Sequence, residues 1–186
     1  MFVLFVAIAD FGRIFATNIA LEAATRDAAE TIANQYLANP PGPLDTAPAA
    51  TDPPSYYGAL HTAGAAVVCA ELRSQPNTNY DPGTQTCPDM PVVFACVHDG
   101  ADTNCGVEAS PGSGGLPASC TQMASTPTNA QSGTQPHARW VEVRVCYHFT
   151  PLISTSMVPL GDFWLQSTRT FIVPCYFRTG SATECG

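Results

Sequence analysis

The feature that most constrains this chain is a long N-terminal stretch without helix breakers. Residues 1 to 39 contain no proline and a single glycine, Gly12, and the stretch ends at Asn39-Pro40-Pro41-Gly42. It predicts one helix of about 38 residues, roughly 57 Å long. That is several times the mean helix length in globular domains. A single domain of a 19.6 kDa chain cannot bury such a helix, so part of it must lie in lipid or against other subunits.

Large apolar side chains recur at spacings of three and four residues in the first half of this stretch, which places them on one helical face. They are Leu4, Ile8, Phe11, Phe15 and Ile19. A narrower stripe of smaller residues continues through the second half, at Leu21, Ala24, Ala28 and Ile32. We predict that the first stripe is covered by neighbouring copies of the chain and serves as a polymerisation element.

Two charges interrupt the apolar half of the helix. Asp10 and Arg13 are three residues apart and are flanked by apolar side chains. Unpaired charges in such surroundings are costly, so we expect the two residues to interact within the helix or with a neighbouring subunit. The alternative is that both face water or lipid headgroups at the end of a bilayer-spanning stretch.

The residues before Asp10, Met1 to Ala9, are all apolar. Nine residues are too few to span a bilayer, which needs about 20. No basic n-region of a signal peptide precedes the run, and the helical pattern continues beyond it. We therefore expect this segment to be retained as the end of a longer apolar helix.

The rest of the chain predicts a compact α+β domain behind the protruding helix. Residues 1–39 form the assembly or membrane helix and residues 40–186 the globular domain, with a Pro-rich linker at 40–55. We expect the following elements: a second helix at 56–74, turns at 75–91, a short strand at 91–98, loops at 99–137, and a hairpin of strands 139–149 and 162–177 connected through 151–161. The strands predict a small antiparallel sheet with disulfide-bonded loops.

Eight cysteines predict up to four disulfides formed in an oxidising compartment. They are Cys69, Cys87, Cys96, Cys105, Cys120, Cys146, Cys175 and Cys185. No two are spaced as C-x-x-C, so zinc-ribbon and thioredoxin patterns are absent. Their connectivity does not follow from the sequence, because eight cysteines allow 105 pairings.

One cysteine can be assigned to a face of the predicted hairpin. Along 139–149 the apolar odd positions face the core, so Cys146 points to the opposite face with Glu142, Arg144 and His148. A hairpin connection centred near Ser156 places Cys146 opposite Gln166, well short of Cys175. We therefore predict that the partner of Cys146 comes from the segment 99–137 or another irregular segment.

Charge and motif content exclude several function classes. The net charge is −8, with seven Arg and no Lys, which argues against nucleic-acid partners and polybasic membrane binding. No nucleophile–base pair or metal-ligand cluster is evident, so we expect no enzymatic activity, no small-molecule substrate and no cofactor. Asp99, Asp102 and Asn104 offer oxygens that suit Ca²⁺, but the EF-hand pattern is missing and these are ordinary turn residues.

The N-terminal run Phe2 to Arg13, with its Asp10-Phe11-Gly12-Arg13 signature, resembles the TadE-like family. These are pseudopilins, or minor pilins, of bacterial tight-adherence pili. The Ala- and Arg-rich stretch Ala23 to Ala29 and the hairpin over Val141 to Phe149 and Pro159-Leu160-Gly161 match the family as well. The resemblance covers residues 1–38 and 139–177. The assembly role of an N-terminal Glu in the family is not carried over, because no Glu occurs in the apolar run.

The resemblance implies a pilin-like fold and a structural role. We expect a subunit that is inserted in the inner membrane before assembly and then polymerises with copies of itself into an extracellular filament for surface attachment. Two alternatives stay open: a minor pilin that initiates or tips another filament, and a secreted disulfide-stabilised adhesin with the loops 99–137 as its recognition surface. Stoichiometry distinguishes the first alternative, and electron microscopy of the native protein distinguishes the second.

Overall fold

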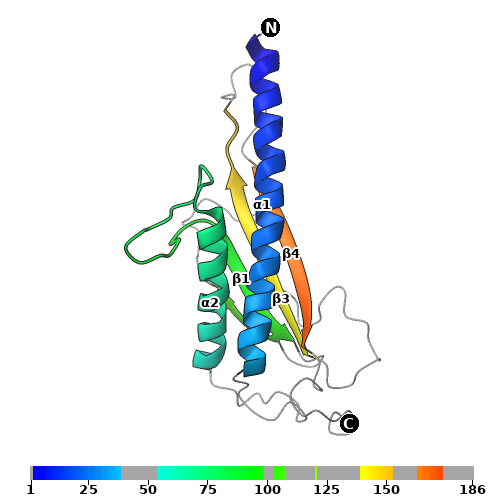
Figure 1. Cartoon of the computed structure of the whole chain (residues 1–186), viewed down its shortest axis with the longest axis vertical. Helices are drawn as coiled ribbons and strands as arrows, with labels where there is room; N and C mark the ends of the chain where they lie inside the picture. Colours follow the sequence, from blue (N-terminus) through cyan, green and yellow to red (C-terminus); the bar gives the residue numbers. More distant parts are fainter. Residues whose placement is uncertain are drawn as a thin grey trace.

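Two helices cover one face of a four-stranded antiparallel sheet, and the first helix extends well past the sheet at its N-terminal end (Figure 1). This is a computed structural model, which describes residues 2–38, 54–98, 103–107, 120, 139–152 and 163–173. The arrangement confirms the predicted long apolar helix, the second helix and the antiparallel sheet.

The long helix, α1, spans Phe2–Ala38, which is 37 residues or about 56 Å. The second helix, α2, spans Pro54–Leu72 and so begins and ends two residues earlier than we predicted. Pro54 occupies the first helical position, where a missing N–H is tolerated. The predicted linker therefore overlaps the start of α2, and its residues 40–53 lie outside the described ranges.

The strands are β1 (Val92–His98), β2 (Thr103–Val107), β3 (Arg139–Phe149) and β4 (Phe163–Val173). They lie in the order β2-β1-β3-β4, and every neighbouring pair is antiparallel. The predicted bounds of β3 are confirmed. The prediction of loops throughout 99–137 is wrong at β2, a short strand of small and polar residues that lacks an alternating apolar pattern. The predicted positions 174–177 of the last strand lie outside the described residues.

The main core lies between the helices and the sheet. Helix α1 contributes its small-residue stripe and Tyr36, α2 contributes Leu60, Val68 and Leu72, and β3 contributes its odd-numbered residues from Val141 to Phe149. Gly64 of α2 makes the close approach of the helices possible, since an added Cβ there would lie 2.9 Å from Cγ1 of Ile32 and closer still to its Cδ1. The second half of α1 is therefore an integral part of the globular core, while its first half protrudes.

A second, smaller cluster lies on the other face of the sheet. It contains Val92, Phe94 and Cys96 of β1 together with Cys120 and Cys146. Glu142 on the same face is also buried. The alternation of β3 predicts a strand buried on one face only, whereas Glu142 and Cys146 on its outer face are buried as well.

Candidate functional site

Asp10 joins the N-terminal half of α1 to the chain that follows β3. Its side chain is almost fully buried, although it lies in the half of the helix that protrudes. The backbone N–H of Leu152, just beyond β3, donates to both carboxylate oxygens at 3.0 Å. Asp10 therefore fixes the helix to the chain leaving the central strand, at the level where α1 passes the end of the sheet.

Arg13 completes this junction from the next turn of the helix. Its Nη1 donates to Oδ1 of Asp10 at 3.0 Å, which confirms the predicted interaction within the helix. The guanidinium also lies over the ring of Phe149, 5.1 Å from the ring centroid, a favourable cation–π geometry. The Phe149 ring in turn lies 5.2 Å from that of Phe163. Both charges are thus held against β3 and the residues that follow it, with the Asp10 carboxylate buried and the Arg13 side chain 28% exposed.

The turn-rich segment after α2 supports the same part of α1. Thr17 donates to Oε1 of Gln75 at 2.8 Å. The backbone N–H of Asn77 donates to the hydroxyl of Tyr147, and its side-chain amide donates to the carbonyl of His148. Burial raises the pKa of Tyr147 above its usual value, although the Asn77 hydrogen bond and the charge of Arg13 act in the opposite direction.

A disulfide between Cys69 in α2 and Cys87 closes this turn segment. Both cysteines are fully buried. The segment between them carries the residues that hold α1 and β3, so the disulfide fixes the position of those contacts relative to α2.

The face of α1 opposite these contacts is apolar and uncovered in the single chain. All five residues of the predicted stripe are more than half exposed, and Phe11 and Phe15 are the most exposed, at 74% and 70%. Phe5, which the periodicity did not single out, is 65% exposed and adds to this surface. We call Leu4, Phe5, Ile8, Phe11, Phe15 and Ile19 the apolar stripe.

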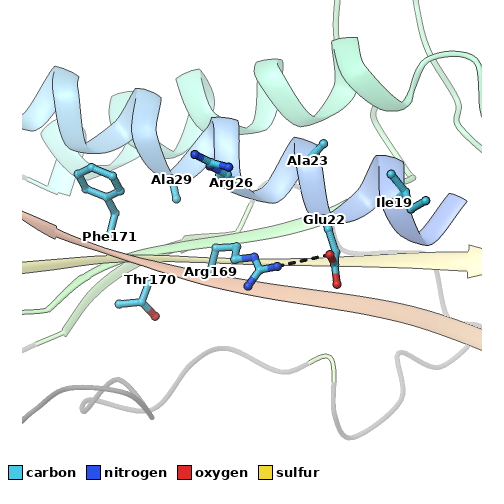
Figure 2. Close-up of a pocket in the computed structure, with 8 residues that line it drawn as sticks. All are labelled: Ile19, Glu22, Ala23, Arg26, Ala29, Arg169, Thr170 and Phe171. Atoms are coloured by element: carbon cyan, nitrogen blue, oxygen red, sulfur yellow. Dashed lines mark ion pairs between the residues drawn. The ribbon is translucent and has the colours of Figure 1, made fainter. Parts of the chain in front are cut away.

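A groove follows directly where the apolar stripe ends. It has a volume of about 580 Å³ and lies between α1 and β4, which is the edge strand of the described sheet. Figure 2 shows its lining, in which one ion pair joins Arg169 of β4 to Glu22 of α1 at 3.4 Å. The lining residues are Ile19, Glu22, Ala23, Arg26, Ala29, Arg169, Thr170 and Phe171.

The outer face of the sheet carries the predicted cysteine arrangement. Cys146 is paired in register with Gln166 and forms a disulfide with Cys120, so both the face and the source of its partner are confirmed. Cys96 is also disulfide-bonded, and its Cα partner on β2 is Cys105. Cys175, Cys185 and the side chain of Cys105 lie outside the described part of the structure.

His61 is a buried histidine away from the apolar stripe and the groove. His61 of α2 is buried, and its Nε2 lies 3.1 Å from the carbonyl oxygen of Val93. Burial lowers the pKa of His61, an effect that the hydrogen bond to Val93 partly offsets. Within the described ranges, no group of three or more His, Cys, Asp or Glu is arranged to hold a metal ion. Asp99, Asp102 and the side chain of Asn104 fall outside those ranges.

Sequence reasoning did not single out Phe5 in the apolar stripe, the Leu152 N–H that holds Asp10, or Phe171 in the groove lining. Phe5 could have been found, because the i,i+3 spacing from Phe5 to Ile8 fits the same face. The others required the tertiary structure, since Leu152 acts through its backbone N–H and Phe171 is brought beside α1 only by the sheet.

No protein-family model, curated protein or solved structure matches this chain. Over Leu4–Ala38, α1 is long and apolar enough to cross a membrane, as judged by length and composition. The site is therefore described by its own geometry: an apolar helical surface, a buried charged junction behind it and a groove beyond it.

Proposed function

We propose that this chain is a pilin-like structural subunit, which polymerises through α1 into an extracellular filament used for surface attachment. The observation that carries the proposal is that two opposite sides of α1 have different surroundings. One side of the helix is fixed to its own domain through Asp10, Thr17 and the core stripe. The other side presents six large apolar residues that the described part of the chain leaves exposed.

The size of this surface favours association. A contiguous row of exposed aromatic and aliphatic side chains is unusual on a protein that stays monomeric in water. Burying each large side chain against a neighbour contributes on the order of 1.5–3 kcal/mol. Because every copy carries the same apolar stripe, we infer that another copy of the chain covers it.

The same helix supports a membrane-inserted form before assembly. Its N-terminal part, before Asp10, extends beyond every contact with the globular domain described above (Figure 1). Over Leu4–Ala38, the length and composition of α1 suit a membrane span. In this proposal the helix anchors the subunit in the inner membrane and exchanges lipid for protein contacts on assembly.

The test is a pair of charge substitutions on the stripe. Phe11→Asp/Phe15→Asp places two carboxylates on the most exposed positions and should abolish filaments seen by electron microscopy. The matched control is Thr62→Asp/Ala66→Asp, which adds two carboxylates at the same spacing on exposed positions of α2. Near-UV circular dichroism should show a folded sheet domain in both variants. Normal filaments from the stripe variant would refute the proposal.

The minor-pilin alternative shares all of these features and differs in the number of copies of the subunit in each filament. A major subunit makes up the bulk of the filament mass, whereas an initiating or tip subunit is present in a few copies per filament. Quantitative mass spectrometry of purified native filaments distinguishes them. A purified native protein that forms no filaments under any condition would favour the adhesin alternative.

A further inference from the structure

The apolar stripe and the groove are one continuous surface. Ile19 is the last residue of the stripe and also the first residue of the groove lining. Beyond Ile19, the same side of α1 carries Glu22 and Arg26. The edge strand β4 lies beside this part of the helix (Figure 2). On the same side of α1, the apolar stripe is therefore followed by the groove.

The charges around the groove exclude lipid as its occupant. Glu22 and Arg169 are each about half exposed and bridge the groove at 3.4 Å, and Arg26 lies in the same lining. Charged side chains at such a position are expensive in hydrocarbon. At a protein interface, a polar rim around apolar contacts is the usual arrangement.

We propose that the groove is the receptor for the Phe11 and Phe15 side chains of a second copy of this chain. This inference rests on the proposed function and specifies which surface of the neighbour receives the stripe. The exposed apolar part of the lining, Ile19, Ala23 and Phe171, offers contacts to aromatic rings, and the small side chain of Ala23 leaves room for them.

The occupant is a second copy because the ridge and the groove are present on every chain and follow one another along the helix axis. The stripe around Phe11 and Phe15 contains no exposed charge, so its entry leaves the Glu22–Arg169 pair intact at the rim. Seating Phe15 at the middle of the groove shifts the neighbour along the helix by roughly 14 Å. A contact between two different surfaces is heterologous and, when the rotation does not close, generates an open filament.

A mixing experiment tests this arrangement. The ridge variant is Phe11→Asp/Phe15→Asp, which keeps the groove, and the groove variant is Ala23→Trp, which fills the groove from an exposed position. Each alone should remain monomeric by light scattering in mild detergent. An equimolar mixture should form dimers, because one intact ridge meets one intact groove. The control Gln166→Trp, on the outer face of β4, should assemble normally.

The outcomes separate this inference from the proposed function. If the wild type assembles but the mixture stays monomeric, the groove is not the receptor, while polymerisation through the stripe still stands. If the groove variant assembles like the wild type, the inference is overturned in the same way. If the wild type itself never associates, both fall. Phe171→Asp provides a second groove variant that acts from β4.

A photo-crosslinking experiment reads the contact directly. p-Benzoylphenylalanine at position 15 should crosslink to the Arg169–Phe171 region of another copy, in filaments assembled from full-length chain. The same probe at position 66 of α2 serves as the control and should give no such product. Crosslinks from position 15 to the Leu4–Ile19 stripe of the other copy, or to lipid, would overturn the inference.

Discussion

At the scale of single residues, Asp10 is the position where the sequence and the structure agree on an unusual feature. A carboxylate within an apolar helical stretch is costly unless it is paired, and here Arg13 and the Leu152 N–H satisfy it. The pairing with Arg13 was predictable because the two residues are one helical turn apart. The contact with Leu152 was not, because it joins residues separated by most of the chain.

We predict that Asp10→Ala destabilises the folded domain by about 2 kcal/mol, because it leaves the Leu152 N–H and Arg13 without their acceptor. Chemical unfolding monitored by tryptophan fluorescence measures the effect. The control is Glu22→Ala, which breaks the exposed pair with Arg169 and should cost about 0–1 kcal/mol. A double-mutant cycle with Arg13→Ala should give a coupling of roughly 1 kcal/mol; no coupling would mean that the pair acts independently.

His61 predicts a pH dependence of stability. Its pKa is lowered in the folded state by burial, so below about pH 6.5 the unfolded chain binds more protons than the folded chain. This contribution to stability is fully present above that pH and is lost as the pH falls toward the lowered pKa.

His61→Gln keeps a side-chain N–H for the Val93 carbonyl and removes the titration. We expect the variant to lose less stability than the wild type between pH 7 and pH 5, as measured by denaturant midpoints. His148→Gln changes a half-buried histidine on the other side of the domain and serves as the control. Parallel pH profiles for wild type and His61→Gln would contradict the prediction.

At the scale of elements, the close packing of α1 on α2 depends on Gly64. We predict that Gly64→Leu destabilises the domain by about 2 kcal/mol, because the new side chain must displace Ile32. Gly58 in the same helix has no neighbour within 4 Å of an added Cβ. Gly58→Ala should therefore stabilise by about 0.5–1 kcal/mol through reduced backbone entropy. In thermal unfolding, Gly64→Leu should have a lower midpoint than the wild type and Gly58→Ala a higher one.

The turn segment 73–91 contacts α1 and β3 and follows α2. We predict that removing its Cys69–Cys87 disulfide loosens this segment locally. Cys69→Ala/Cys87→Ala should destabilise by about 3 kcal/mol and should accelerate amide exchange at residues 75–90. Cys120→Ala/Cys146→Ala opens a loop of similar length and is the matched control. It should lower global stability by a similar amount without selective exchange in 75–90. Equal exchange patterns in the two variants would show that the Cys69–Cys87 bond does not hold this segment.

The elements themselves were predictable to different degrees. The long stretch without proline identified α1, and the strict alternation of apolar and polar residues identified β3. Strand β2 was missed because Thr-Asn-Cys-Gly-Val carries no alternating pattern, and it is a strand only because β1 pairs with it. The burial of Glu142 was not predicted either, because the alternating pattern of β3 places it on the face opposite the core.

At the scale of the whole molecule, the net charge of −8 opposes the association that the apolar stripe favours. Like charges on neighbouring copies repel over roughly 30 Å in 0.01 M salt but only about 8 Å in 0.15 M salt. We therefore predict that the critical concentration for assembly falls several-fold over this range, measured by sedimentation.

Neutralising exposed carboxylates tests the charge mechanism. Asp27→Asn/Glu71→Gln removes two exposed negative charges away from the apolar stripe. The variant should assemble at lower concentration in 0.01 M salt and show a weaker salt dependence than the wild type. An unchanged salt dependence would indicate that hydrophobic contact alone controls assembly.

The local features of this protein follow from its amino-acid order alone: a helix too long for its domain, its apolar stripe, the alternation of β3 and the face of Cys146. Each follows from chemistry that repeats every two or three to four residues and needs no distant partner. The contact of Asp10 with Leu152, the burial of Glu142 on the outer sheet face and the groove between α1 and β4 emerge only from the three-dimensional packing. These depend on contacts between segments far apart in the chain, whose relative positions are determined by the packing of the whole core.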